Sequence, residues 1–177
     1  MQLKRPLLDV ALHGLCPLLT IAVLLVSAGG GEAILVCLLC GFLSLGMMIT
    51  GGLLAVYRYR TQRALMPAIT VPIVCLALIL SVAVTQWPLR VTYALSREAF
   101  DAVAHRVRSG EVIATPVRVG LFTIRGAGLA HSGIVYLWTF PDAGGNTGFV
   151  QCRRDDVPFN LWSIVRLDDR WQFISED

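Results

Sequence analysis

Three long apolar runs occupy the first half of the chain. They extend over residues 10–28, 33–57 and 64–87, and the second and third contain no charged side chain. A helix of the 24 residues in the third run rises about 36 Å, which exceeds the hydrocarbon thickness of about 30 Å. The pattern therefore predicts three transmembrane helices in tandem.

The first run allows a second interpretation. Lys4 and Arg5 precede it, and Val26-Ser27-Ala28 resembles the small-residue cleavage site of a signal peptide. The run is long for a signal sequence, and only Gly29-Gly30-Gly31-Glu32 separates it from the second run. We therefore expect an uncleaved helix, with a cleaved signal as the alternative.

The periodicity changes after Pro88. Phe100, Val103, Ala104 and Val107 recur at helical spacing, which predicts an amphipathic helix over residues 96–109. Ser96 is its expected N-cap and Gly110 its expected C′ residue.

Short β-rich segments follow this predicted helix. We expect a strand over 117–124, a break at 126–128, a strand over 134–140, a turn region over 141–148 and a short strand over 149–152. Two further segments, 161–167 and 171–174, flank Asp168-Asp169-Arg170 and predict a hairpin. The aromatic side chains expected between helix and sheet are Trp138, Phe149, Trp162, Trp171 and Phe173.

These patterns predict a membrane protein in which three transmembrane α-helices precede a small α+β domain. The helical region is expected at residues 1–87 and the α+β domain, with one helix on about five mostly antiparallel strands, at residues 88–177. The chain is 15% charged, below the usual content of about 25% in soluble domains. This composition argues against a chain that is wholly soluble or wholly disordered.

Charge is distributed unevenly between the two predicted parts. Residues 1–87 contain five basic and two acidic side chains, a net charge of +3, whereas residues 88–177 contain ten of each. The positive-inside rule then places the N-terminus in the cytoplasm and the α+β domain outside a cell membrane crossed several times. The neutral second half argues against nucleic-acid binding.

Few residues are candidates for chemistry. Asp9 and His13, and likewise Asp101 and His105, are four residues apart, so each pair would share a helix face. These pairs are candidate polar or titratable sites, with a solvated or interfacial face as the alternative. No other pattern indicates a catalytic residue, a metal site or a cofactor, and we expect the protein not to be an enzyme.

Small residues recur at a spacing of four in the second apolar run. Ala33, Cys37 and Gly41 would lie on one helix face, where small side chains allow two helices to approach closely. We expect them to pack against neighbouring helices, and self-association is an alternative.

The expected function is that of a non-enzymatic binding protein. It would present its α+β domain to another membrane or envelope protein, with the lipid bilayer as its surroundings and an oligomeric state that the sequence leaves open. Loops over residues 141–148 and 153–160 are the expected contact sites. The alternative is an accessory subunit of a membrane enzyme or transport complex.

Overall fold

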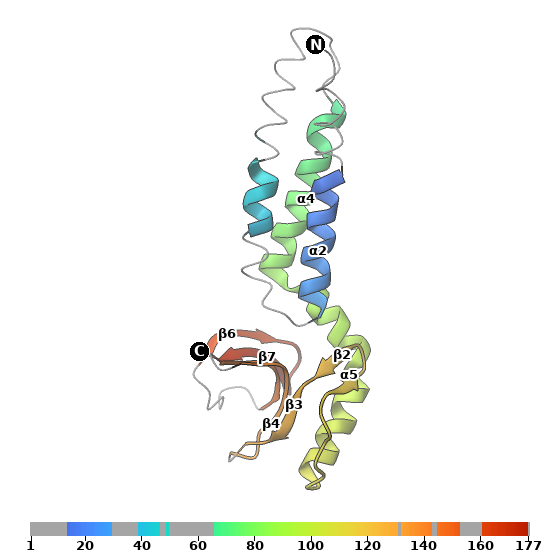
Figure 1. Ribbon diagram of the computed structural model, residues 1–177, viewed down its shortest axis with the longest axis vertical. Coiled ribbons are helices and arrows are strands. Elements are labelled where there is room, and N and C mark those ends of the chain that lie inside the picture. Colours follow the sequence, from blue (N-terminus) through green and yellow to red (C-terminus); the bar gives the residue numbers. More distant parts are fainter. Residues whose placement is uncertain are drawn as a thin grey trace. The chain divides into compact units, whose positions relative to one another are not determined.

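The computed structural model describes residues 14–29, 39–46, 49, 66–130, 132–142, 145–152 and 161–176 (Figure 1). The chain divides into two compact units. The first comprises Met1–Val26 and Ala33–Thr85, and the second comprises Ser27–Glu32 and Gln86–Asp177.

The first unit is helical where it is described. It contains α2 (Cys16–Ala28), a helical segment over residues 39–46, and α4 (Met66–Thr85). Val23, Cys40, Ile79 and Val82 form a buried apolar cluster. These helices pack through small and β-branched side chains.

The prediction of three transmembrane helices, at residues 10–28, 33–57 and 64–87, is wrong. Among the described residues, no single helix is both long enough and apolar enough to cross a membrane. The 13 residues of α2 rise about 20 Å, short of a hydrocarbon core of about 30 Å. Of the second run, the structure describes only residues 39–46 and 49.

The third run shows why an uncharged stretch is not yet a spanning helix. Among the described residues, only Ile73–Thr85 and Trp87–Arg108 taken together are both long and apolar enough, and the helix is broken and bent between them. Gln86, at the bend, has a left-handed φ of 51°. Hydropathy measures composition, whereas the continuity of a helix depends on its backbone. The predicted cell-membrane location and multi-pass threading depended on the three spans, so these two predictions are wrong as well.

The second unit is an α+β structure built on α5 (Trp87–Arg108). Pro88 lies in its first turn, where a proline favours helix initiation. The predicted apolar positions Phe100, Val103, Ala104 and Val107 are all buried, as are Tyr93 and Leu89, about two and three turns before Phe100. Gly110 follows the helix with φ 83°, which confirms it as the terminating residue.

Ser96 is not the N-cap, because α5 begins nine residues before it. Its hydroxyl donates to Thr92 O at 2.9 Å and accepts from Leu121 N–H at 3.0 Å. Ser96 therefore connects the middle of α5 to the turn between two short strands. Gly120 in that turn has φ 59°, and a Cβ there would lie 3.0 Å from Ser96 Cα, so this close approach requires glycine.

Seven strands follow α5, in two antiparallel sheets within the described residues. A two-stranded sheet joins β1 (Val117–Val119) and β2 (Phe122–Ile124). A five-stranded sheet has the order β3-β4-β5-β7-β6. Its strands are β3 (Gly126–Leu129), β4 (Val135–Asp142), β5 (Gly145–Gln151), β6 (Leu161–Arg166) and β7 (Trp171–Glu176).

The five-stranded sheet has a buried cluster on each face. Phe149, Trp171 and Phe173 pack with α5 on one face, as predicted. Trp138 lies in a second cluster with Val150 and Ile174, so its predicted place between helix and sheet is wrong. The side chain of Trp162 lies outside the described residues.

The predicted strands need three corrections. The run 117–124 is a hairpin, because Gly120 turns the chain between β1 and β2. Residues 126–128 belong to β3 and do not break the sheet. Residues 141–148 lie mostly in β4 and β5, where Pro141 pairs with Asn146. The predicted hairpin around Asp168-Asp169-Arg170 is confirmed by the pairing of β6 with β7.

Candidate functional site

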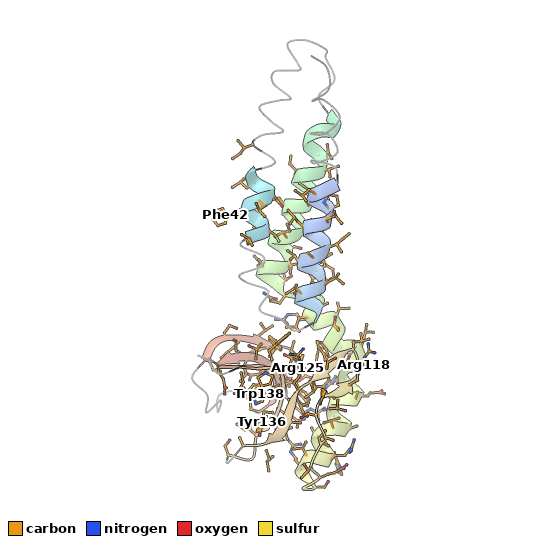
Figure 2. All side chains as sticks on the ribbon, in the orientation of Figure 1. Phe42, Arg118, Arg125, Tyr136 and Trp138 are labelled. Carbon is orange, nitrogen blue, oxygen red and sulfur yellow. The ribbon has the colours of Figure 1, made fainter. Side chains whose placement is uncertain are left out.

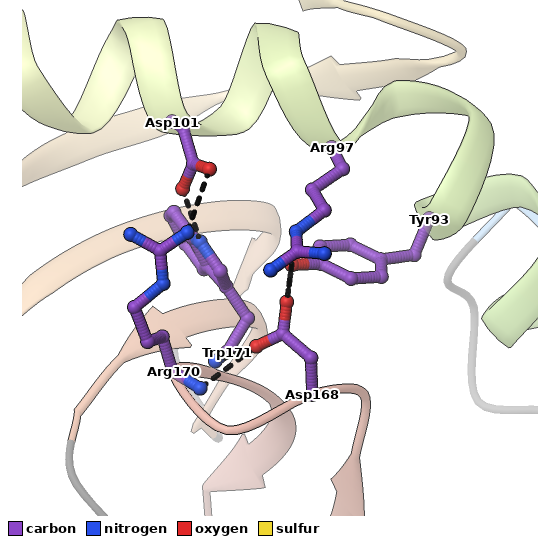
Figure 3. A network of polar contacts seen from close by, with 6 residues as sticks. All are labelled: Tyr93, Arg97, Asp101, Asp168, Arg170 and Trp171. Atoms are coloured by element: carbon purple, nitrogen blue, oxygen red, sulfur yellow. Dashed lines mark hydrogen bonds and ion pairs between the residues drawn. The ribbon is translucent and has the colours of Figure 1, made fainter.

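A polar network connects α5 to the turn between β6 and β7 (Figure 3). Tyr93, Arg97 and Asp101 are spaced by four along α5, so they form one stripe of the helix. Asp168 and Arg170 belong to the turn opposite this stripe.

Asp168 is the centre of the network. Its Oδ2 accepts a hydrogen bond from the Tyr93 hydroxyl at 2.6 Å and lies 3.3 Å from Arg97 Nε. Its Oδ1 accepts from the backbone N–H groups of Arg170 at 2.8 Å and Trp171 at 2.7 Å. One carboxylate therefore shapes the turn and holds the helix against it.

The titration of Tyr93 and Asp168 follows from these contacts. Burial raises the pKa of the Tyr93 phenol, and its hydrogen bond to Asp168 raises that pKa further. Burial alone would raise the pKa of Asp168, but the hydrogen bonds from Tyr93, Arg170 and Trp171, with the charge of Arg97, leave the pKa below its usual value. The pair therefore remains phenol and carboxylate at neutral pH.

Asp101 makes a second connection between the helix and this turn. Its Oδ1 accepts from Trp171 Nε1 and its Oδ2 pairs with Arg170 Nη2, both at 3.0 Å. His105, one helical turn further along, is exposed. Among the described residues, no hydrogen bond or ion pair joins Asp101 to His105. The geometry gives Asp101 a positioning role toward Trp171, and the titratable role of the pair stays a prediction.

The remaining candidates fall mostly outside the described residues. Asp9, His13, Ala33 and Cys37 all lie there. Gly41 is described, and among the described residues no atom lies within 4 Å of a Cβ built on it; its role in helix packing stays a prediction. In the described part of the chain, no group of three or more His, Cys, Asp or Glu side chains is placed to hold a metal ion. The expected absence of enzyme activity and of cofactors stays a prediction.

The end strand β3 is the second feature with potential for binding. The Ala130 N–H donates to Ile134 O at 2.8 Å, and β3 pairs with β4 without a register shift. Bonding alternates along an antiparallel strand, so the Ala130 bond and this register direct the N–H groups of Gly126 and Gly128 toward β4. The N–H and C=O groups of Ala127 and Leu129 consequently point away from the sheet. The alternation is interrupted just before β3, where the Arg125 N–H also donates to Trp138 O, the Cα partner of Gly126.

No strand in the described residues takes up these outward groups. β3 pairs with β4 alone. Within the same residues, no backbone hydrogen bond from a turn or loop reaches Ala127 or Leu129, although the connection over residues 109–116 is described in full. The outer edge of β3 therefore offers two N–H donors and two C=O acceptors.

Aromatic rings replace the missing side chains of β3. A Cβ on Gly126 would lie 3.3 Å from Trp138 Cδ1, and one on Gly128 would lie 2.7 Å from Tyr136 Cζ. The two rings stack at 5.4 Å with an interplanar angle of 23°. Tyr136 and Trp138 thus extend from β4 across the glycines of β3, in the part of the sheet labelled in Figure 2.

The two ends of the sheet differ in how they are protected. β6, at the opposite end, has a register shift between Leu161 and Ser163 and an exposed Arg166. Bulges and charges of this kind discourage another strand from pairing with an edge. β3 contains no charge and no proline, so the edge of β3 is the one suited to accept a strand.

Sequence reasoning missed both features. Tyr93 and Arg97 continue the four-residue spacing of Asp101 and His105 toward the N-terminus, but Tyr93 lies before the start of the predicted helix. Asp168 was recognised only as part of a turn. The glycines of β3 indicated a break, although alternation of Tyr136 and Trp138 in the next strand was a signal that large rings occupy one face there.

Comparisons of the chain with models of protein families, with curated proteins and with solved structures find no match. The functional interpretation therefore rests on the second unit itself. The polar groups of the network around Asp168 bind one another, whereas the backbone groups of Ala127 and Leu129 point outward. This contrast favours the β3 edge as the binding site.

Proposed function

We propose that the protein is a non-enzymatic binding protein whose second unit takes up an extended segment of a partner protein as an additional strand beside β3. The observation that carries the proposal is the Ala130 N–H bond to Ile134 O, which with the register of β3 directs the N–H and C=O groups of Ala127 and Leu129 outward. Strand addition obtains affinity from such main-chain hydrogen bonds, and neighbouring side chains select the partner.

The rest of the second unit suits this role because it holds the edge in place. α5 packs on the sheet through a core that includes Phe100, Phe149 and Trp171, all with 0% exposure. Ala127 packs against this core. A rigid edge loses little conformational freedom when a strand is added, which favours binding.

The test uses a proline that removes one outward N–H. Ala127→Pro leaves the bonds of Gly126 and Gly128 to β4 intact, and proline is tolerated where an edge N–H faces outward. The probe is a random heptapeptide library displayed on phage, panned on the intact chain, with recovered peptides resynthesised for titration. We expect these peptides to bind the wild type and to lose at least tenfold in affinity for Ala127→Pro.

Ile164→Pro is the matched control on the opposite edge. Leu167 N–H donates to Trp171 O, so the same alternation directs the Ile164 N–H away from β7. This variant should bind the peptides as the wild type does. Leu129→Pro tests the second outward position if Ala127→Pro loses its near-ultraviolet circular dichroism. Recovery of no peptide, or equal binding by the wild type and a folded edge variant, would overturn the proposal.

A further inference from the structure

The surroundings of β3 also indicate the chemistry of the segment that would bind there. We infer that the β3 edge selects an extended apolar segment carrying an acidic residue at the end that lies beside Arg125. This inference rests on the proposed function, because it specifies the partner of the same edge.

The apolar preference follows from the two faces of β3. An added residue opposite Gly126 or Gly128 finds no side chain on β3 itself. It meets instead the rings of Trp138 and Tyr136, which cover those glycines. On the other face, Leu129 is 48% exposed. Directly opposed residues in paired strands come within about 5 Å of each other at Cβ, so both faces favour apolar side chains.

The acidic preference follows from charge. Residues 112–141 contain Arg118 and Arg125 but no Asp or Glu. Arg125 immediately precedes β3, is exposed, and lies with its guanidinium carbon 5.2 Å from the centre of the Phe140 ring. Within the described residues, no ion pair neutralises Arg125. A carboxylate at the neighbouring end of an added strand would supply the missing charge.

The position of Arg125 is set by the sheet and not by a flexible loop. Its backbone N–H donates to Trp138 O at 2.7 Å, which fixes the start of β3 against β4. The Phe140 ring supports the side chain through a cation–π contact. The cation is therefore held at one end of the edge, so it distinguishes the two ends of a bound segment.

The experiment compares two synthetic heptapeptides of alternating valine and threonine. One carries glutamate at its first position and the other carries lysine there, and each is titrated against the intact chain at low salt. A third and fourth peptide carry these residues at the last position, since the added strand can run in either direction. We expect one glutamate peptide to bind about three- to fivefold more tightly than its lysine counterpart, the size of an exposed ion pair.

Substitutions at Arg125 assign this preference. Arg125→Gln should abolish the discrimination between glutamate and lysine, while Arg125→Lys should retain it. Arg166→Gln removes an exposed arginine from the opposite end strand and should leave the discrimination unchanged. Equal binding of glutamate and lysine peptides by the wild type, with Ala127→Pro blocking both, would overturn the acidic preference and leave strand addition standing. Discrimination that survives Arg125→Gln would also overturn it.

Discussion

Replacing Asp168 by alanine tests whether one carboxylate holds α5 against the sheet. The substitution removes the acceptor of the Tyr93 hydroxyl at 2.6 Å and of two turn N–H groups at 2.8 and 2.7 Å. A hydrogen bond to a charged group contributes about 1.5–3 kcal/mol. The pair with Arg97 adds little, because the Arg97 side chain is 52% exposed and exposed pairs contribute up to about 1 kcal/mol. Water can replace the acceptor at the turn, so the expected loss is about 2–4 kcal/mol.

The measurement is native-state hydrogen exchange of the β7 amides, which reports the opening of the second unit separately from the helices of the first. Asp169→Ala is the matched control, because Asp169 is the neighbouring exposed carboxylate. Its expected effect is within about 0.5 kcal/mol. Tyr93→Phe completes a double-mutant cycle, with an expected coupling to Asp168 of about 1–2 kcal/mol. If Asp168→Ala and Asp169→Ala give equal opening free energies, the network does not stabilise the unit.

Four further predictions concern the same unit. The pKa of Asp168 lies below its ordinary 3.8, so the stability that its carboxylate contributes is present above pH 3.8 and is lost as pH falls through the lower folded pKa; Asp168→Asn should therefore reduce the loss of stability below about pH 4. The pKa of Tyr93 is raised from 10.0. The stability contributed by its neutral phenol should therefore be lost above about pH 10 in the wild type, and Tyr93→Phe should show no such loss. Phe100→Ala should lower the free energy of unfolding by about 3–5 kcal/mol, because the ring is fully buried among four aromatic neighbours; a urea titration showing less than about 1 kcal/mol would contradict the packing. Gly120→Ala should cost more than Gly110→Ala in the same titration, because both have positive φ but only Gly120 meets Ser96; equal losses would refute the close approach.

The sequence was most informative where local pattern and tertiary contact agree. The stripe from Phe100 to Val107 and the hairpin around Asp168 were both predicted, since each combines a clear periodicity with a turn or helix terminator. The true start of α5 was hidden because Leu89 and Tyr93 merge with the apolar run that precedes them. The prediction of spanning helices failed because it rested on uncharged runs, and hydropathy carries no information on where a helix bends.

The candidate sites depend on contacts that no local pattern contains. Tyr93 and Asp168 are 75 residues apart in sequence, so only the packed fold brings the phenol to the carboxylate. β3 contradicts the low strand preference of glycine because Tyr136 and Trp138 cover its open face, an example of tertiary packing overriding propensity. The outward direction of the Ala127 backbone groups follows from the hydrogen bond of Ala130 and from the pairing register of β3 with β4. That register cannot be read from the sequence alone.

Amide hydrogen exchange at β3, measured residue by residue on the intact chain without any partner, tests the open edge most directly. We expect fast exchange at Ala127 and Leu129 and slow exchange at Gly126 and Gly128, because the bonding phase set at Ala130 directs the N–H groups of the two glycines toward β4. Protection at Ala127 and Leu129 equal to that of the two glycines would show that the edge is already occupied, and would contradict strand addition as the function of this unit.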